Sequence, residues 1–140
     1  MVDAEIFKPA FAMVGLTAVV FVRMYWLRLW ELHRAGLSAQ AVSTSSEMAR
    51  LLADTRAADN FRNLFELPVL FYVALVVAAL TQQVNAVTLS LAWLFVLLRI
   101  VHSWIHCTYN KVMHRFYAYL AGGLVLWTLW GVLAVGLLRR

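Results

Sequence analysis

Polar and ionisable side chains recur at helical spacing inside three otherwise apolar stretches of this sequence. Residues spaced by three and four positions lie on one face of a helix, so each set forms a stripe. Ionisable groups are costly inside an apolar stretch and usually serve a function there. Arginine is suited to binding carboxylates through two parallel hydrogen bonds. The stripes are Asp59, Arg62, Asn63 and Glu66; Arg99, His102 and His106; and Arg115 and Tyr119.

Two interpretations of these stripes involve no ligand. In the first, they form a buried polar network that fixes the register of the helices, with Glu66 and Arg99 as an internal ion pair. In the second, Arg28, Arg56 and Arg115 extend along the membrane toward lipid headgroups.

A metal or haem site is a third alternative. His102 and His106 are four residues apart, which places two imidazoles on one helical face at ligand spacing. Glu66 is the available third ligand, because residues 67–140 contain no Asp or Glu. Two histidines are a weak signal, so we assign no metal ligands.

The elements that carry the stripes are long enough to cross a membrane. The four apolar stretches run over about 9–29, 63–81, 86–106 and 116–138, and a helix needs roughly 20 residues to span the hydrocarbon. The composition agrees, with 64% hydrophobic and 14% charged residues against about 25% charged in a soluble domain. The sequence therefore predicts one domain over residues 1–140, an all-α integral membrane bundle of four helices.

The connections between these stretches set the expected orientation. The first is long, and its Thr44-x-x-Glu47 sequence has the pattern of a capping box, so a helix is expected to begin near Ser45. The turn at 82–85 has no basic residue, whereas Lys111 and Arg115 follow the third stretch. Lys and Arg concentrate on cytoplasmic loops, so both termini are expected to be extracytoplasmic. The basic residues of the first connection and its flanks are Arg28, Arg34, Arg50, Arg56 and Arg62.

Other classes of protein are less compatible with the sequence. The net charge of +5 comes from residues at the ends of apolar runs rather than from a basic patch, so nucleic acid is not an expected partner. Cys107 is the single cysteine, so no intrachain disulfide forms. Asp3 and Glu5 argue against a signal peptide.

The residues also carry a resemblance to a known family. The run from Asp59 to Tyr72, followed by Arg99-Ile-Val-His102 and by Arg115-x-x-x-Tyr119, resembles the MAPEG family, the membrane-associated proteins in eicosanoid and glutathione metabolism. The resemblance covers nearly the whole chain and is closest to short bacterial members. It implies a homotrimer in the bacterial inner (plasma) membrane. It further implies that glutathione binds as co-substrate between protomers, near the cytoplasmic face.

The resemblance also implies roles for individual residues. The family's glutathione-binding positions fall on Arg62, Asn63, Glu66, Arg99, His102 and His106. The arginine that stabilises the thiolate falls on Arg115, and the ring after it on Tyr119. The sequence departs from the family pattern in having Asp59 for an arginine, Pro68 only two residues after Glu66, and His106 for a tyrosine.

The implied function is that of a glutathione-dependent transferase or peroxidase. Its substrate would be a lipophilic electrophile that arrives from the membrane lipid. The alternative is a non-catalytic protein of the same fold, such as an accessory subunit of a larger membrane complex.

Overall fold

The computed structural model describes residues 4–38, 40, 43–44, 46–47, 50 and 54–139. After a short 3-10 turn, α1 covers Lys8–Ala35, α3 covers Arg56–Asn63 and α4 covers Leu67–Leu80. α5 then covers Ala86–Cys107, and α6 covers Val112–Leu138. Four helical segments in this described part are long and apolar enough to cross a membrane, with α3 and α4 counted as one. The all-α, multi-pass architecture is thus confirmed.

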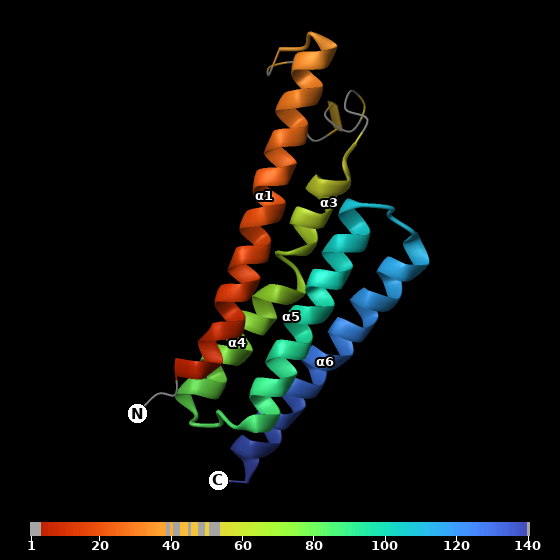
Figure 1. Cartoon of the computed structure of the whole chain (residues 1–140). Helices are drawn as coiled ribbons and strands as arrows, with labels where there is room; N and C mark the ends of the chain where they lie inside the picture. Colours follow the sequence, from red (N-terminus) through yellow and green to blue (C-terminus); the bar gives the residue numbers. More distant parts are fainter. Residues whose placement is uncertain are drawn as a thin grey trace.

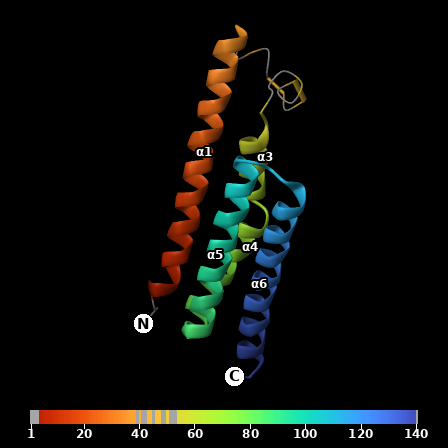
Figure 2. The same cartoon turned by 45° about the vertical axis from the view of Figure 1, so that its right-hand side comes forward.

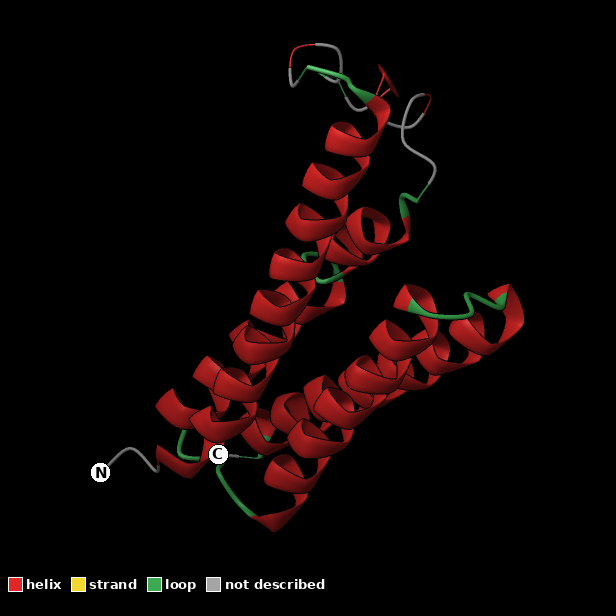
Figure 3. Cartoon of the chain, turned by 45° about the horizontal axis from the view of Figure 1, so that its top comes forward, coloured by secondary structure: helices red, strands yellow, loops and turns green. Residues whose placement is uncertain are grey.

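The helices run alternately up and down (Figure 1). Both termini and the turn between α4 and α5 lie at one end of the bundle, and the loop between α5 and α6 lies at the other. α5 and α6 lie side by side in both views, and α1 lies along α3 (Figure 2). The elements are almost entirely helical, as Figure 3 shows.

Local sequence signals explain where the helices begin and end. α1 begins with Pro9 in its first turn, where a missing N–H costs nothing, and ends at Gly36, whose φ of 64° lies in the left-handed region. α5 begins at a capping box, in which the Asn85 side chain accepts from the Thr88 backbone and the Thr88 side chain accepts in return. Asn110, with φ of 49°, makes the turn before α6.

The capping box expected in the first connection is also present. The backbone N–H of Thr44 donates to Glu47 Oε2 at 3.0 Å, and the N–H of Glu47 donates to Thr44 Oγ1 at 3.2 Å. Ser45 itself lies outside the described residues. Thr55 is not helical, so a helix from this box does not run on into the second span.

The core combines stacked phenylalanine rings with buried alanine side chains where helices approach one another. Phe71 of α4 stacks on Phe95 of α5 with ring centroids 4.5 Å apart. Ala74 and Ala78 of α4, and Ala92 of α5, are completely buried. Small residues let membrane helices approach closely, where packing rather than the hydrophobic effect holds them together.

Candidate functional site

A break in the second span positions the first polar stripe. The sequence predicts one helix over 63–81, but α3 ends at Asn63 and α4 begins at Leu67. Pro68 explains the break, because a proline within a helix clashes with the carbonyl four residues earlier, here that of Leu64, and has no N–H to donate to it. Asn63 and Glu66 therefore lie on either side of the break, rather than on one helical face.

Arg99 is the central side chain of the site. It is 0% exposed, and its Nη2 donates to the backbone carbonyl of Asn63 at 2.9 Å. In the described part of the chain, its Nε and Nη1 have no hydrogen-bond partner. The Tyr119 ring covers the guanidinium, with 5.2 Å between Cζ and the ring centroid. A buried arginine with unused donors is costly, and a carboxylate is the group that best satisfies such donors.

The two histidines lie on the same face of α5 but have different partners. Nδ1 of His102 lies 3.2 Å from the backbone carbonyl of Arg115, and its Nε2 has no partner. Nδ1 of His106 lies 3.4 Å from the side-chain nitrogen of Asn63. The two rings stand edge to face, with centroids 5.6 Å apart. Within the described ranges, no three His, Cys, Asp or Glu side chains come together as a metal site.

Glu66 and Tyr119 close the group at the protein surface. The Tyr119 hydroxyl donates to Glu66 Oε2 at 3.0 Å. Glu66 is exposed, and Tyr119 is half-buried. The structure therefore does not have the internal Glu66–Arg99 ion pair. Instead, the Tyr119 hydroxyl donates to the Glu66 carboxylate, and the Tyr119 ring covers the Arg99 guanidinium. We call these six residues the polar cluster: Asn63, Glu66, Arg99, His102, His106 and Tyr119.

Two of the expected site residues point elsewhere. The guanidinium of Arg115 donates to Asn110 Oδ1 at 2.8 Å, beside the loop between α5 and α6. Arg115 joins the polar cluster only through its backbone carbonyl, which His102 contacts. Arg62 is exposed, and its Nη1 lies 3.6 Å from a carboxylate oxygen of Asp59.

Two arginines outside the predicted site, Arg23 and Arg56, hold the end of α5. Arg23 Nη2 donates to the Cys107 carbonyl at 2.7 Å, and Arg56 donates to the Thr108 carbonyl. Cations are favourable at a helix C-terminus, where carbonyls lack partners. The Arg56 side chain, expected to extend toward headgroups, is thus bound to other residues of the chain. Its fixed position follows from Asp54, which binds it at 2.7 Å.

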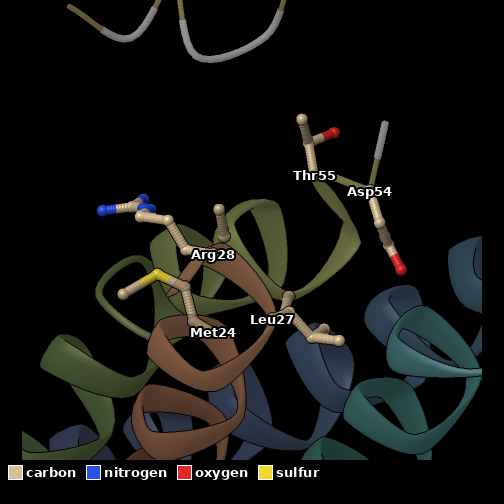
Figure 4. A pocket seen from close by; sticks show the side chains of 7 residues that line it. Met24, Leu27, Arg28, Asp54 and Thr55 are labelled. Atoms are coloured by element: carbon tan, nitrogen blue, oxygen red, sulfur yellow. The ribbon is translucent and has the colours of Figure 1, made fainter. Parts of the chain in front are cut away.

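Asp54 organises the approach to this end of the bundle. Its backbone N–H donates to Glu31 of α1 at 3.2 Å, and its carboxylate accepts from Arg56 Nε at 2.8 Å. The hydrogen bond from Arg56 holds the pKa of Asp54 below its ordinary value. Figure 4 shows the small cavity beside it, about 20 Å³, with Arg28 pointing away from Asp54.

A buried polar pair next to the polar cluster was also missed. Asn60 is 0% exposed; its amide nitrogen lies 3.5 Å from the Cys107 sulfur, and its oxygen accepts from Ser103 at 3.3 Å. Asn60 is three residues before Asn63, and Ser103 follows His102 directly. Their positions beside the stripes were the available signal, but nothing in the sequence indicates that α3 and α5 bring them into contact.

An apolar groove of about 520 Å³ lies on the other side of the break, between α1 and the α3–α4 segment. Leu64 and Phe65 of the break line it, together with Phe21 and Phe61. Leu64 and Phe65 of the break thus line the groove, whereas Asn63 and Glu66, which flank these two residues, belong to the polar cluster.

Comparison with known proteins gives the family. A model of the MAPEG family matches residues 8–135, which is nearly the whole chain. The chain belongs to the MAPEG family. No curated protein and no solved structure matches it. MAPEG proteins include glutathione transferases and peroxidases as well as non-catalytic members, so membership establishes the fold and leaves the activity to be argued from the site.

Compared with the MAPEG pattern, the site is only partly assembled within one chain. The asparagine and the glutamate of the Arg-Asn-x-x-Glu element belong to the polar cluster, whereas the arginine, Arg62, lies outside it. Of the two positions expected to act on sulfur, Tyr119 is in the cluster and the Arg115 guanidinium is at its edge.

Proposed function

We propose that this protein binds glutathione and uses it to conjugate or reduce a lipophilic electrophile. The observation that supports this most is the completely buried Arg99, whose Nε and Nη1 have no partner among the residues that the structure describes. Glutathione carries two carboxylates, an ammonium group and a thiol. Arg99 suits one carboxylate, and Glu66 suits the ammonium group.

In this proposal, each residue has a defined part. Arg99 positions a carboxylate once the Tyr119 ring moves aside. Asn63 and the two histidines contribute the remaining polar contacts, with His102 Nε2 available for one hydrogen bond. Glutathione supplies the nucleophilic sulfur, and Arg115 stabilises its thiolate, because a nearby cation favours the charged form of a thiol. For this, Arg115 must exchange Asn110 for the sulfur.

The electrophile is proposed to approach through the bilayer. The apolar groove beside Leu64 and Phe65 offers about 520 Å³ to a lipophilic molecule and opens where the protein faces hydrocarbon. Pockets for small molecules are mostly apolar with few polar groups, which fits a groove next to a polar cluster.

Assembly as a homotrimer is proposed from the surface of the single chain. The Glu66 carboxylate is exposed at the level of the break, inside the second membrane-crossing segment. A charged group that faces lipid is unfavourable, so a neighbouring protomer or a bound ligand must cover it. The trimer of the MAPEG resemblance would provide that cover.

The proposed location is the plasma membrane of a bacterium, with both termini outside the cytoplasm. The basic residues concentrate at the end of the bundle where α1 ends and α3 begins. The test labels single cysteines in intact cells, in a Cys107→Ser background. An impermeant maleimide should label Ala86→Cys and spare Ser38→Cys; the reverse pattern would overturn the orientation.

A turnover assay tests the proposed activity. Purified protein in lipid vesicles is given glutathione with 1-chloro-2,4-dinitrobenzene, or with a lipid hydroperoxide. The wild type should consume one of these, and Arg99→Lys, which keeps the charge but loses the two-pronged geometry, should be impaired. Arg34→Lys, an exposed arginine at the same end of the bundle, is the matched control and should keep the wild-type rate.

One observation favours the second candidate, a non-catalytic member of the family. Arg99 has no exposed surface, and it lines neither the cavity beside Asp54 nor the apolar groove. A polar cluster that only fixes helix register would be closed in this way. Absence of turnover with both substrates, together with absence of glutathione binding, would support this candidate.

A further inference from the structure

A second groove lies at the opposite end of the bundle from the polar cluster. It has a volume of about 580 Å³ and runs between the α4–α5 turn and the last turns of α6. Figure 1 shows the end of α6 beside this turn, near both termini. Its lining residues are Gln83, Asn85, Thr128, Gly131, Val132, Val135, Gly136 and Arg139. The groove is independent of the proposed glutathione chemistry.

The groove follows one face of α6 through a single membrane leaflet. Its α6 residues are spaced by three, one, three, one and three positions from Thr128 to Arg139, which keeps them on one side of the helix. At 1.5 Å per residue, this stripe is about 16 Å long. That is about half of the roughly 30 Å hydrocarbon thickness.

The inner part of the groove is apolar and open. Thr128 uses its hydroxyl in a 2.8 Å hydrogen bond to the Leu124 carbonyl, so its polar group is satisfied. A Cβ added at Gly131 would meet no atom within 4 Å, which shows that this glycine leaves free space in the groove. Val132 and Val135 add an apolar wall. This part suits a hydrocarbon chain.

The outer end of the groove carries a cation, Arg139, which has no anionic partner among the described residues. Arg139 is exposed, and within the described chain its side chain has no ion pair or hydrogen bond. Residues 67–140 contain no acid, and Lys8, at the same end of the bundle, is paired with Glu5 at 2.6 Å. Arg139 directly follows the segment Val112–Leu138, which is long and apolar enough to cross a membrane, so we expect it at the level of the headgroups.

We propose that this groove binds one anionic phospholipid from the leaflet at the termini. The phosphate group lies against Arg139, and an acyl chain runs inward along Val135, Val132 and Gly131. An anionic phospholipid needs a cation at headgroup level and an apolar track one leaflet long, and the groove has both. Charge complementarity and length therefore favour this occupant. A zwitterionic lipid would gain less from the unpaired cation.

Native mass spectrometry of the protein in mild detergent tests the proposal. Equal amounts of phosphatidylglycerol and phosphatidylcholine with identical acyl chains are added. The wild type should retain phosphatidylglycerol about fivefold better, which corresponds to about 1 kcal/mol for one basic residue at a membrane surface. Arg139→Gln should lose this preference. Lys8→Gln, which removes a paired cation at the same end, is the control and should keep it.

A second pair of variants tests the acyl track. A Cβ added at Gly131 or at Gly15 would meet no atom within 4 Å. Gly131→Leu should therefore fill part of the groove and lower retention of both lipids, whereas Gly15→Leu, on α1, should not. Equal retention of the two lipids by the wild type, or an unchanged preference in Arg139→Gln, would overturn the proposal. Efficient disulfide formation between copies of Val132→Cys would also overturn it, because a second chain would then occupy the groove.

Discussion

At the scale of single residues, the proposed function assigns the recognition of glutathione and the activation of its sulfur to different residues. Arg99 and Glu66 lie in the polar cluster and would hold the ends of the tripeptide. The guanidinium of Arg115, bonded to Asn110, stays at the edge, where a thiol could reach it. Binding and thiolate formation should therefore respond to different substitutions.

The first prediction concerns this separation. Arg115→Ala should raise the pKa of the bound thiol by about 1–3 units and slow turnover, because the thiolate loses its nearby cation. Glu66→Gln should weaken glutathione binding and leave that pKa nearly unchanged. The ultraviolet absorbance of the thiolate, titrated on each purified variant, measures the pKa. If Arg115→Ala changes neither absorbance nor rate, Arg115 is not the activating cation, and His106 becomes the next candidate.

The sequence predicted which residues lie on the same helical face more accurately than it predicted which side chains contact each other. Spacing placed Arg99, His102 and His106 on one face of a helix, and the structure has them so. The partner of Glu66 did not follow from spacing, since the helix break at Pro68 turns its carboxylate toward Tyr119 rather than Arg99. Such choices depend on distances between helices, about which a single sequence contains no direct information.

At the scale of elements, the ends of the helices were the least predictable feature. α1 continues to Ala35 and α6 begins at Val112, beyond the apolar stretches that ended at 29 and began at 116. Apolar composition marks the part of a helix inside the bilayer, whereas capping marks where the helix ends. The break before α4 was missed because the polar stripe reads as continuous across it.

A close contact between α6 and the α4–α5 turn gives the second prediction. Gln83 Nε2 donates to the Leu133 carbonyl at 3.2 Å, and a Cβ added at Gly136 would clash with Gln83 Oε1. Gly136→Ala should therefore displace the buried amide. The variant should be less stable than Gly131→Ala, where space is free, by about 1–3 kcal/mol. Unfolding in mixed micelles with increasing dodecyl sulfate measures the difference.

A double substitution identifies the cause of that loss. In a Gln83→Ala background, the amide is absent, so the extra cost of Gly136→Ala should disappear. An equal loss of stability in both backgrounds would show that the Gln83 contact is not responsible.

The third prediction concerns the junction of Asp54 with Arg56, which ties the first connection to the end of α5. The pKa of Asp54 is lowered by its hydrogen bond to Arg56, so this carboxylate stabilises the fold when ionised. Its contribution should be fully present above the ordinary Asp pKa of about 3.9 and lost as the pH falls through the lowered value. Asp54→Asn should lower the melting temperature in detergent at pH 7.

The pH dependence of the stability difference tests whether the ionised carboxylate is responsible. The difference between wild type and Asp54→Asn should begin to shrink below about pH 4, where Asp54 of the unfolded chain becomes protonated. It should be smallest below the lowered pKa of the folded state, where both proteins carry a neutral side chain. A difference that stays constant down to the lowest accessible pH would mean that the carboxylate charge is not what stabilises the junction. Glu47→Gln, at an exposed capping box, is a control for loss of one surface charge.

At the scale of the whole molecule, apolar surface and charge distribution follow directly from the sequence. Four long apolar stretches can only be satisfied by a bilayer, and helices satisfy their own backbone groups there. How the copies of such a bundle assemble is not encoded in hydropathy. The exposed Glu66 carboxylate is the structural feature that a neighbouring protomer would cover.

The fourth prediction is therefore a trimer. Light scattering of the purified protein, corrected for bound detergent, should give three copies per particle. Glu66 should also be shielded in that particle, so that Glu66→Cys reacts slowly with a soluble maleimide, while Ser38→Cys reacts fast. A folded monomer that retains its activity would remove the basis for a site shared between protomers.

The most direct test of the central proposal is a calorimetric titration of glutathione into the purified wild-type protein. Saturable heat is expected, with affinity lowered about 10- to 100-fold in Arg99→Lys, as for the loss of a hydrogen bond between charged groups. Arg34→Lys should bind as the wild type does. Absence of saturable heat in the wild type, or equal affinity in Arg99→Lys, would contradict the assignment of Arg99 as the residue that holds glutathione.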